Sequence, residues 1–575
     1  MNNTFESLSQ VLTRQASTRG DSIAYRYLGQ PWGTLTSLSF GELERRSQAM
    51  ACELARLKPA GTRAVLLYPQ SIEFIVAFFA CLRAGITAVP LSLPINRQDQ
   101  ARLLGAIQDC NPGLVLTLGS IGRMPEMTLL AQARPDLTLL FTDEKGGPEA
   151  LDADLLKSLP QHLPDDVAFL QYTSGSTGAP KGVMVTHANI MANQYMIANA
   201  FQCTPKDVGL TWLPLYHDMG LIGFVMHSIY VGGLNYLMSP LDFLKRPASW
   251  LEAISQYKVT ISGAPDFAYS LCTNRLTDDV ISKLDLSHWR IAQNGAEPIK
   301  ASVLDAFTEK FRSAGFNPFA HFPCYGLAEA TLFVSGGPHE QQHRTFTLDE
   351  QSLEQGIVKT TAQKGRVLVS AGKIADDLDV RIVNPTNLEE LGTAHVGEIW
   401  VRGSSIASGY WNKPEISEQI FHARLSETDG AFLRTGDLGF ITEDEHLVIT
   451  GRLKDLIILN GRNFYPQDFE TVAERAHHSL RAGSSAVFLA GEHNNNIVVV
   501  VEVKKTEMAH PDLQSIKTAV RRALTEEFGV PIFEIVVAAN GEVLKTTSGK
   551  IRRSDCREAW LNGRLLDAGK VQLSV

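Results

Sequence analysis

One loop in the sequence combines the residue types that hold phosphate. Residues 172–182 read Tyr-Thr-Ser-Gly-Ser-Thr-Gly-Ala-Pro-Lys-Gly; the glycines let backbone amides turn toward an anion, while hydroxyl groups and an ammonium group add donors. The loop is not the P-loop of nucleotide triphosphatases, because no Gly-Lys-Ser/Thr stands at the required spacing. A plain turn of small polar residues is the alternative interpretation. The predicted phosphate contacts are Thr173, Ser174, Gly175, Ser176, Thr177, Gly178 and Lys181.

Four further motifs place an aromatic ring, carboxylates and cations later in the chain. Taken alone, each could be an ordinary turn or a solvated surface segment. Their order along one chain indicates that the motifs belong to one functional site. They are Tyr325-Gly326-Leu327-Ala328-Glu329, Arg434-Thr435-Gly436-Asp437-Leu438, Gly451-Arg452-Leu453-Lys454-Asp455 and Thr547-Ser548-Gly549-Lys550.

The elements around these motifs alternate between strand-like and helix-like patterns. Residues 64–68 read as a strand and residues 73–82 as a helix, a rhythm that favours parallel sheets with crossover helices. The pattern restarts after residue 452, with strand-like residues 497–503 and helix-like residues 512–528. The sequence therefore predicts an α/β N-terminal part and a small α+β C-terminal domain. The polar stretch between Glu329 and Gly397 has little periodicity and is predicted to be an insertion rather than core.

Composition limits the possible partners and compartments. The 575 residues are 44% hydrophobic, enough for at least two domains, and the net charge of −9 gives no broad basic field for nucleic acid. An anionic substrate must therefore bind to cationic side chains placed locally at its site. The N-terminus lacks a secretory pattern, no stretch predicts stable membrane insertion, and the seven cysteines are widely spaced. These features predict a cytoplasmic protein.

The five motifs together resemble, along nearly the whole chain, the adenylate-forming (AMP-binding) superfamily that includes acyl-CoA synthetases and luciferases. Residues 212–223, Trp-Leu-Pro-Leu-Tyr-His-Asp-Met-Gly-Leu-Ile-Gly, and residues 460–468, Asn-Gly-Arg-Asn-Phe-Tyr-Pro-Gln-Asp, are similar to fatty acyl-AMP ligases. The resemblance implies the acyl-CoA synthetase-like fold. In this fold a large N-terminal domain of stacked αβαβα sheets with a barrel-like β subdomain spans residues 1–452. A mobile domain spans residues 453–575, with an insertion at about 340–372.

The resemblance also implies the reaction and the residues that perform it. A fatty acid and MgATP would give acyl-adenylate and pyrophosphate, with Lys550 bridging the carboxylate and the α-phosphate, His217 between the acyl and nucleotide sites, and Glu329 with Thr173 at Mg²⁺. Nucleotide contacts would come from Asn294, Gly295, Ala296, Glu297, Tyr325, Gly326, Leu327, Ala328, Asp437, Arg452 and Lys454. The acyl pocket would be lined by Trp212, Met219, Gly220, Ile222, Gly263 and Phe267.

The implied acid needs no general base, because its pKa is close to the ~4.3 of Glu and it is already ionised at neutral pH. Catalysis then rests on positioning and on charge neutralisation. The acceptor implied by the branch is the phosphopantetheine thiol of an acyl carrier protein, supplied in trans. Two positions depart from the wider superfamily: Ala328 replaces a threonine, and Lys454 stands where an aspartate is common at the hinge.

Three alternatives remain open at this level. The nearest is a fatty acyl-CoA synthetase or a stand-alone amino acid adenylation enzyme, and another is a catalytically inactive acyl-AMP sensor, which the presence of Lys550, Glu329 and Asp437 disfavours. The third is a zinc hydrolase, since His339-Glu340-Gln341-Gln342-His343 matches the His-Glu-x-x-His pattern. Glycines and a proline precede this motif, which argues against the helix that would align its two histidines.

Overall fold

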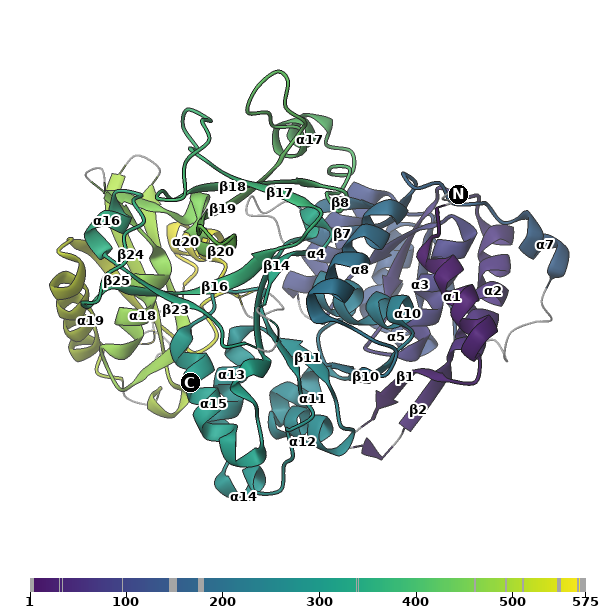
Figure 1. Cartoon of the computed structure of the whole chain (residues 1–575), viewed down its shortest axis with the longest axis horizontal. Coiled ribbons are helices and arrows are strands. Elements are labelled where there is room, and N and C mark those ends of the chain that lie inside the picture. Colours follow the sequence, from purple (N-terminus) through teal and green to yellow (C-terminus); the bar gives the residue numbers. More distant parts are fainter. Residues whose placement is uncertain are drawn as a thin grey trace.

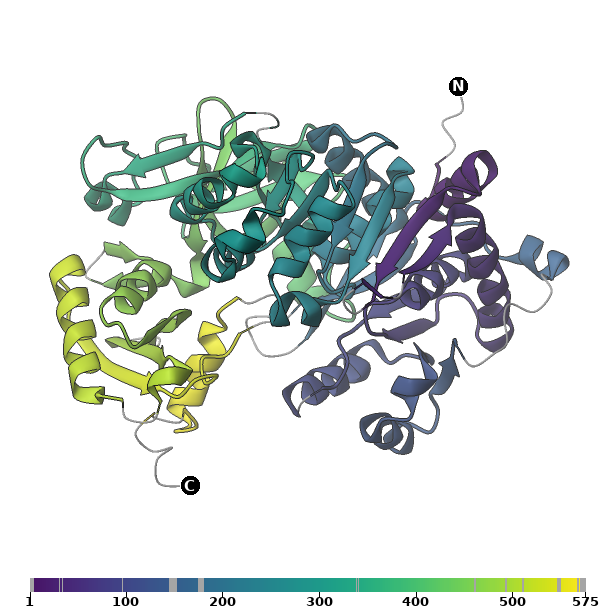
Figure 2. The ribbon, with the colours of Figure 1, turned by 90° about the horizontal axis from the view of Figure 1, so that it is seen from below.

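The computed structural model describes residues 5–29, 32–33, 35–95, 97–143, 152–173, 180–337, 339, 341–459, 462–491, 494–508, 511–545, 550–565 and 568. Within these residues, two large sheets with flanking helices form most of the molecule, and a smaller group of elements at the C-terminal end lies to one side (Figures 1 and 2). We call this group, from residue 453 onward, the C-terminal lobe.

The first sheet has six strands and carries the predicted phosphate loop at one edge. Its strands are parallel except for the last pair, which is antiparallel and flanks the loop. In spatial order they are β6 (Thr138–Phe141), β5 (Leu114–Thr117), β3 (Arg63–Leu67), β4 (Thr87–Pro90), β7 (Val167–Thr173) and β8 (Lys181–Thr186).

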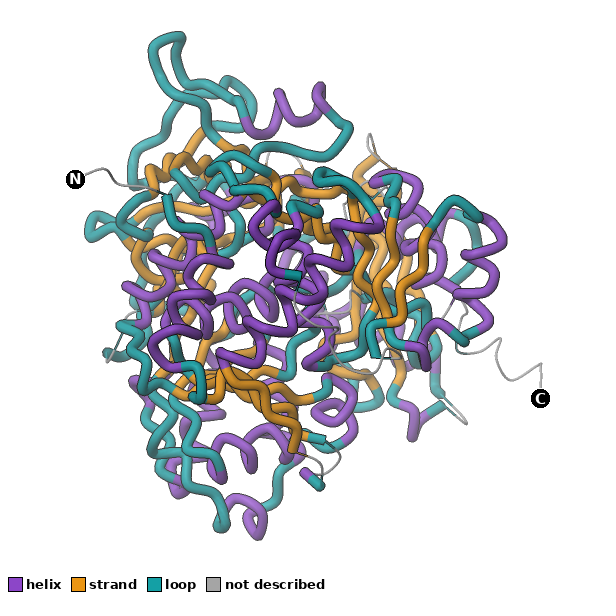
Figure 3. Tube along the Cα trace, turned by 90° about the vertical axis from the view of Figure 1, so that its right-hand side faces the viewer, coloured by secondary structure: helices purple, strands orange, loops and turns teal. Residues whose placement is uncertain are grey.

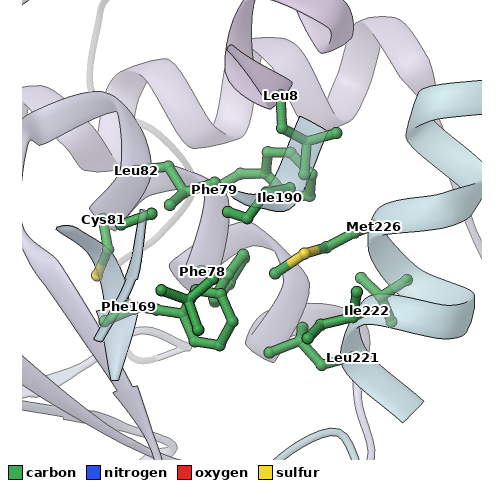
Figure 4. Close-up of a cluster of buried hydrophobic side chains, with 14 of the residues drawn as sticks. Leu8, Phe78, Phe79, Cys81, Leu82, Phe169, Ile190, Leu221, Ile222 and Met226 are labelled. Atoms are coloured by element: carbon green, nitrogen blue, oxygen red, sulfur yellow. The ribbon is translucent and has the colours of Figure 1, made fainter. Parts of the chain in front are cut away.

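Helix α3 (Ile72–Ala84) shows why the core forms beside this sheet. Its sequence is apolar on nearly every face, a pattern that predicts a fully buried helix. It begins at Ser71, whose side chain accepts from the Phe74 amide, and ends at Gly85, whose φ of 66° suits glycine. Phe78 packs edge-on against Phe169 of β7 at a ring distance of 5.8 Å, within the cluster drawn in Figure 4.

The second sheet changes character along its length. Strands β1, β10, β9, β11, β12 and β13 pair in parallel, and the strands from β13 to β17 pair antiparallel. The order is β2 (Leu35–Ser39), β1 (Ile23–Leu28), β10 (Leu234–Met238), β9 (Val208–Thr211), β11 (Ile261–Ala264), β12 (Ile291–Asn294), β13 (His321–Gly326), β14 (Phe333–Gly336), β16 (Arg366–Ile374), β20 (His446–Arg452), β19 (Leu433–Ile441), β18 (Gly397–Gly403) and β17 (Leu378–Val383); β15 (Thr345–Leu348) pairs with β16.

Helices cover both sheets, and a view from the side shows them layered between and over the strands (Figure 3). One segment between them is a π-helix, Leu221–Met226, a rare form that often marks functional sites. The helices nearest the site are α4 (Arg97–Cys110), α8 (His187–Phe201), α9 (Asp218–Gly220), α13 (Asp266–Arg275) and α15 (Ala301–Phe311).

The C-terminal lobe has its own sheet and two apolar clusters. Strand β24 (Asn494–Val503) has a run of buried valines, as expected for a strand covered on both faces. Around it lie β21 (Ile457–Leu459), β22 (Arg462–Phe464), α18 (Pro466–Arg475), β23 (Leu480–Gly491), α19 (Leu513–Phe528), β25 (Ile532–Ala538) and α20 (Arg553–Leu561).

The mixed α/β fold is confirmed, but the polar stretch after Glu329 is not simply an insertion. It contributes β14, β16 and β17 to the second sheet. Residues 340–372 contain β15 and α16 (Glu350–Glu354), whose Leu348 and Leu353 are buried, and their status as an insertion stays a prediction. Periodicity did not reveal β16 because the strand buries four consecutive residues, 369–372, instead of alternating.

Candidate active site

A cleft of about 2250 Å³ separates the C-terminal lobe from the ends of the strands in the larger part of the molecule. It is larger than the ~300–1,000 Å³ of most small-molecule pockets, so it has room for more than one ligand. Sixteen of the predicted site residues line it: Thr173, Lys181, His217, Met219, Phe267, Ala296, Glu297, Tyr325, Gly326, Leu327, Ala328, Glu329, Asp437, Arg452, Lys454 and Lys550.

Antiparallel pairing of β19 with β20 sets Asp437 opposite Arg452. The two are register partners, and Arg452 Nε lies 3.0 Å from Asp437 Oδ1. Tyr325, from β13, donates its hydroxyl to Asp437 Oδ2 at 2.7 Å. The Asp437 carboxylate raises the pKa of Arg452, and burial raises that of Tyr325. Three motifs distant in sequence therefore meet at one buried carboxylate.

A second buried carboxylate, Glu398 on β18, holds the turn that presents Asp437. Its side chain is 3% exposed and accepts from Arg434 Nη2 at 2.8 Å, Trp400 Nε1 at 3.0 Å and the Gly436 amide at 3.2 Å. Gly436 has a φ of 68°, a conformation that glycine adopts without strain. The hydrogen bonds of Glu398 thus hold the Arg-Thr-Gly-Asp motif in place.

Glu329 lies close to the end of β8. Tyr410 donates its hydroxyl to Glu329 Oε1 at 2.7 Å, and the ammonium group of Lys181 lies 5.1 Å from the centre of the Tyr410 ring. Thr173 and Lys181 are register partners at the ends of β7 and β8. A carboxylate, a hydroxyl and an ammonium group therefore face one region of the cleft, a set suited to phosphate and a divalent cation.

Lys550 reaches this cleft from the C-terminal lobe. Burial lowers its pKa, Arg452 lowers it further, and the carboxylates of Asp218, Asp437 and Glu297 oppose that shift. The ammonium group is therefore close to groups from both the Asp437 cluster and the His217 segment. An anion entering the cleft would meet it in surroundings that contain little water.

Carboxylates also border the cleft near His217 and Glu297. His217 Nδ1 lies 2.6 Å from Asp218 Oδ1. Glu297 accepts from the Phe267 amide at 2.5 Å, and burial raises its pKa to about 7. Burial also raises the pKa of Asp266, to about 6, although Asn294 donates to it at 2.9 Å. Asn294 is fully buried behind the cleft wall.

The predicted acyl-pocket residues separate into two groups. Met219 and Phe267 line the cleft, whereas Trp212 lies behind it, stacked on Phe243 at 4.0 Å. Ile222 packs in the apolar core beside α3 (Figure 4), and Gly263 lies under Gln293. Gly220 and Gly295 also stand outside the lining. Gly223, within the motif at residues 212–223, and four apolar residues that the sequence analysis missed form one arm of the cleft; the four are Ile197, Phe201, Leu332 and Phe333.

Some predicted residues lie outside the part of the chain that the structure describes, and the zinc hydrolase alternative is wrong. Ser174, Gly175, Ser176, Thr177, Gly178 and Glu340 lie outside the described residues. His339 accepts a hydrogen bond from Arg290 Nη1 at 2.9 Å, and the ring of His343 packs edge-on against that of His321. Neither histidine lies on a helix, which a zinc hydrolase motif needs. Among the described residues, no three His, Cys, Asp or Glu side chains gather to hold a metal ion.

Further polar residues line the cleft without having been predicted. Asp218 and Arg552 adjoin predicted residues, so proximity in sequence could have suggested them. Tyr410 and Arg102 belong to no motif, and the fold alone brings them to the site.

The cleft brings an aromatic ring, a carboxylate and cations together beside an apolar arm, and comparison gives the family of the chain. The AMP-binding enzyme family model matches residues 12–411, and a model of the AMP domain of Disco-interacting protein 2-like proteins matches residues 454–569. The chain therefore belongs to the AMP-binding enzyme family.

Relatives match over their full length. The chain is 39% identical to a medium-chain-fatty-acid–[acyl-carrier-protein] ligase of Moorena producens, covering 98% of this chain and 96% of the relative. It is 34% identical to a long-chain-fatty-acid–AMP ligase of Mycobacterium marinum, covering 97% of both. A structure from work on fatty acyl-adenylate ligases of E. coli and L. pneumophila aligns with a TM-score of 0.86 and 31% identity, covering 97% of this chain and 98% of that one.

Another structure extends the comparison to a ligand-bound state. It is the fatty acyl-adenylate ligase of L. pneumophila in complex with acyl adenylate and pyrophosphate, with a TM-score of 0.73 and 34% identity over 97% of this chain and 96% of that one. In the part of the chain that the structure describes, no helix has the length and apolar character needed to cross a bilayer.

Proposed function

We propose that the protein is a fatty acyl-AMP ligase. It activates a medium- or long-chain fatty acid with MgATP and passes the acyl group to the phosphopantetheine thiol of an acyl carrier protein acting in trans. The observation that carries the proposal is the position of Lys550 in one cleft with the Tyr325–Asp437–Arg452 cluster and an apolar arm. The full-length relatives named as fatty acid ligases support it.

The residues divide the work according to their chemistry. Tyr325 offers a ring face for adenine, and Asp437 offers a carboxylate to the ribose hydroxyls. The fatty acid chain occupies the apolar arm lined by Phe201 and Phe333, so that its carboxylate points toward His217 and Lys550. Lys550 offsets the repulsion between the carboxylate and the α-phosphate, the main barrier between two anions.

Glu329 and Thr173 are the proposed ligands of Mg²⁺. Carboxylate, hydroxyl and phosphate oxygens are the hard ligands that this ion prefers, and they fit the residues present. When bound, Mg²⁺ neutralises phosphate charge. Tyr410 orients Glu329 through its 2.7 Å hydrogen bond.

Acyl transfer requires Lys550 to leave, so we propose that residues 453–575 form a mobile domain that turns near Leu453 and Lys454. Residues 340–372 would limit this motion, because they make three ion pairs with the C-terminal lobe. Arg366 lies 3.0 Å from Asp468, Glu354 lies 2.7 Å from Arg462, and Lys364 lies 2.6 Å from Glu527.

The pair between Arg366 and Asp468 is the strongest of the three. The Arg366 side chain is 10% exposed, its guanidinium group lies 4.1 Å from the centre of the Tyr465 ring, and it donates to the Thr450 carbonyl at 2.9 Å. The Lys364 side chain is 78% exposed, and such surface pairs contribute at most about 1 kcal/mol. A restraint on the lobe would therefore act mainly through Arg366 and Glu354.

One experiment tests the reaction and the acceptor together. The protein is incubated with labelled fatty acids, ATP and Mg²⁺, with either coenzyme A or a pantetheinylated carrier protein, and acyl-AMP is separated from thioester. We expect acyl-AMP to accumulate with coenzyme A and acyl thioester to form on the carrier. Rapid acyl-CoA formation would assign the chain to acyl-CoA synthetases instead.

A second experiment tests the restraint. The double variant Glu354→Gln and Arg366→Gln should increase acyl-CoA formation relative to acyl-AMP, because the lobe can then turn further. Asp444→Asn is the control, since it breaks an ion pair with Arg344 that does not involve the C-terminal lobe. Unchanged acyl-CoA formation in the double variant would remove this role from residues 340–372.

All seven cysteines are free thiols, five of them buried, which supports a reducing compartment such as the cytoplasm.

A further inference from the structure

Two arginines from opposite sides of the cleft keep buried donors without a partner. Arg102 stands on α4, and Arg552 immediately precedes α20 of the C-terminal lobe; both line the cleft. Their side chains are 29% and 14% exposed. Within the described residues, Arg102 Nη2 and Arg552 Nη1 have no hydrogen-bond partner. A buried guanidinium donor left unpaired is costly, so each of these nitrogens is available to an acceptor on a bound ligand.

The carboxylates nearby do not fill this role. Arg102 pairs with Asp99 at 3.4 Å, and Arg552 pairs with Asp555, yet the two nitrogens named above remain unpaired. Burial lowers the pKa of Arg102, and the charge of Arg552 lowers it further. The carboxylates of Asp99 and Asp555 oppose that shift, so both arginines and both carboxylates lie within electrostatic range of one another across the cleft. An anion between the arginines would accept charge-assisted hydrogen bonds from the two unpaired nitrogens.

The surroundings indicate which anion this is. Helix α4 packs on the start of β8: a Cβ built on Gly105 would lie 3.3 Å from Pro180 Cγ, and Lys181 follows directly. On the other side, Arg552 is two residues from Lys550. The space between the arginines thus lies beside the groups proposed to hold the phosphates.

We propose that Arg102 and Arg552 form a clamp across the cleft for the β- and γ-phosphates of ATP, and hence for the pyrophosphate product. The inference rests on the proposed adenylation reaction. In that reaction a bond forms between the carboxylate oxygen and the α-phosphorus, and the bond to the bridging oxygen of the β-phosphate breaks. The electron pair leaves with pyrophosphate, and the charge balances without proton transfer.

The clamp also links product release to motion of the lobe. With the polyanion bound, Arg102 and Arg552 are both attracted to it and hold the C-terminal lobe against α4. Once pyrophosphate leaves, this shared attraction is lost, and the lobe is free to withdraw Lys550 before acyl transfer. Release of the leaving group thereby favours the second half of the reaction.

The test is direct binding of magnesium pyrophosphate by calorimetry, with the wild type, Arg102→Gln, Arg552→Gln, the double variant and Arg312→Gln as an exposed control. Each clamp variant should bind roughly tenfold to a hundredfold more weakly, and Arg312→Gln should bind normally. The Lys variants of both positions should recover part of the affinity and report that the fold is intact. The double variant should lose less than the sum, because both arginines share one ligand.

The outcomes are separable. Equal pyrophosphate affinity in the wild type and both Gln variants would overturn the clamp. So would Gln variants that bind pantetheine phosphate more weakly but bind pyrophosphate with unchanged affinity. The assay contains no fatty acid. If pyrophosphate binding depends on both arginines but no fatty acid is adenylated, the proposed function fails and the clamp stands; the reverse pattern removes the clamp alone.

Discussion

Replacing Lys550 with alanine removes the ammonium group that the C-terminal lobe brings into the cleft. Its buried position implies an effective dielectric constant of about 20, at which an opposite charge ~4 Å away is stabilised by about 4 kcal/mol. Part of this is present before reaction, since Asp218, Asp437 and Glu297 already surround the group. The loss expected for acyl-AMP formation is therefore roughly a hundredfold to a thousandfold.

The assay must separate the two half-reactions. Fatty acid–dependent exchange between ATP and labelled pyrophosphate reports adenylation, and transfer from prepared acyl-AMP to the carrier protein reports the second step. Lys550→Ala should lose the first activity and keep the second within about threefold, because Lys550 is withdrawn before transfer. The control is Lys157→Ala, whose side chain is 79% exposed. Adenylation above a tenth of the wild-type rate, or equal losses in both steps, would refute the assigned role.

The remaining predictions concern the groups around Lys550. Tyr325→Phe removes the donor to Asp437 and should raise KM for ATP about tenfold, measured against Tyr195→Phe, an exposed control. Glu398→Gln leaves Arg434 without its buried partner and should lower the free energy of unfolding by about 3–5 kcal/mol in urea titrations. The pKa of Glu297, about 7, lies above its ordinary 4.5, so the folded chain keeps a proton that the unfolded chain releases between these values. Stability should fall as pH rises through that window, and Glu297→Gln should flatten the fall in thermal melting curves.

Sequence motifs located most of the cleft through their resemblance to adenylate-forming enzymes. Asp437 and Lys550 stand in short recognisable patterns, and the resemblance assigns the first to ribose and the second to the α-phosphate. The pairing of Asp437 with Arg452 also follows from the hairpin between β19 and β20, a local feature. These residues are close in sequence to the turns that present them.

The apolar arm was harder to predict because periodicity reports burial and does not distinguish a core from a cavity wall. Ile222 and Gly223 are neighbours on the π-helix, yet Ile222 packs in the core beside α3 while Gly223 faces the cleft. Adjacent residues point to different sides of any helix, but the pattern does not show which side borders a cavity. Phe201, at the end of α8, carries no local signal for a ligand either.

Arg102 illustrates a different limit, and it follows from the overall charge. A chain with net charge −9 cannot attract a polyanion with a broad field, so its cations must be concentrated at the cleft. They come from both sides: Arg102 and Lys181 from the larger part, and Lys550 and Arg552 from the C-terminal lobe. Carboxylates already offset part of these charges: Asp99 pairs with Arg102, Asp555 pairs with Arg552, and Asp437 acts on Lys550. A single sequence motif cannot encode this arrangement, because the cations converge only when the two sides come together.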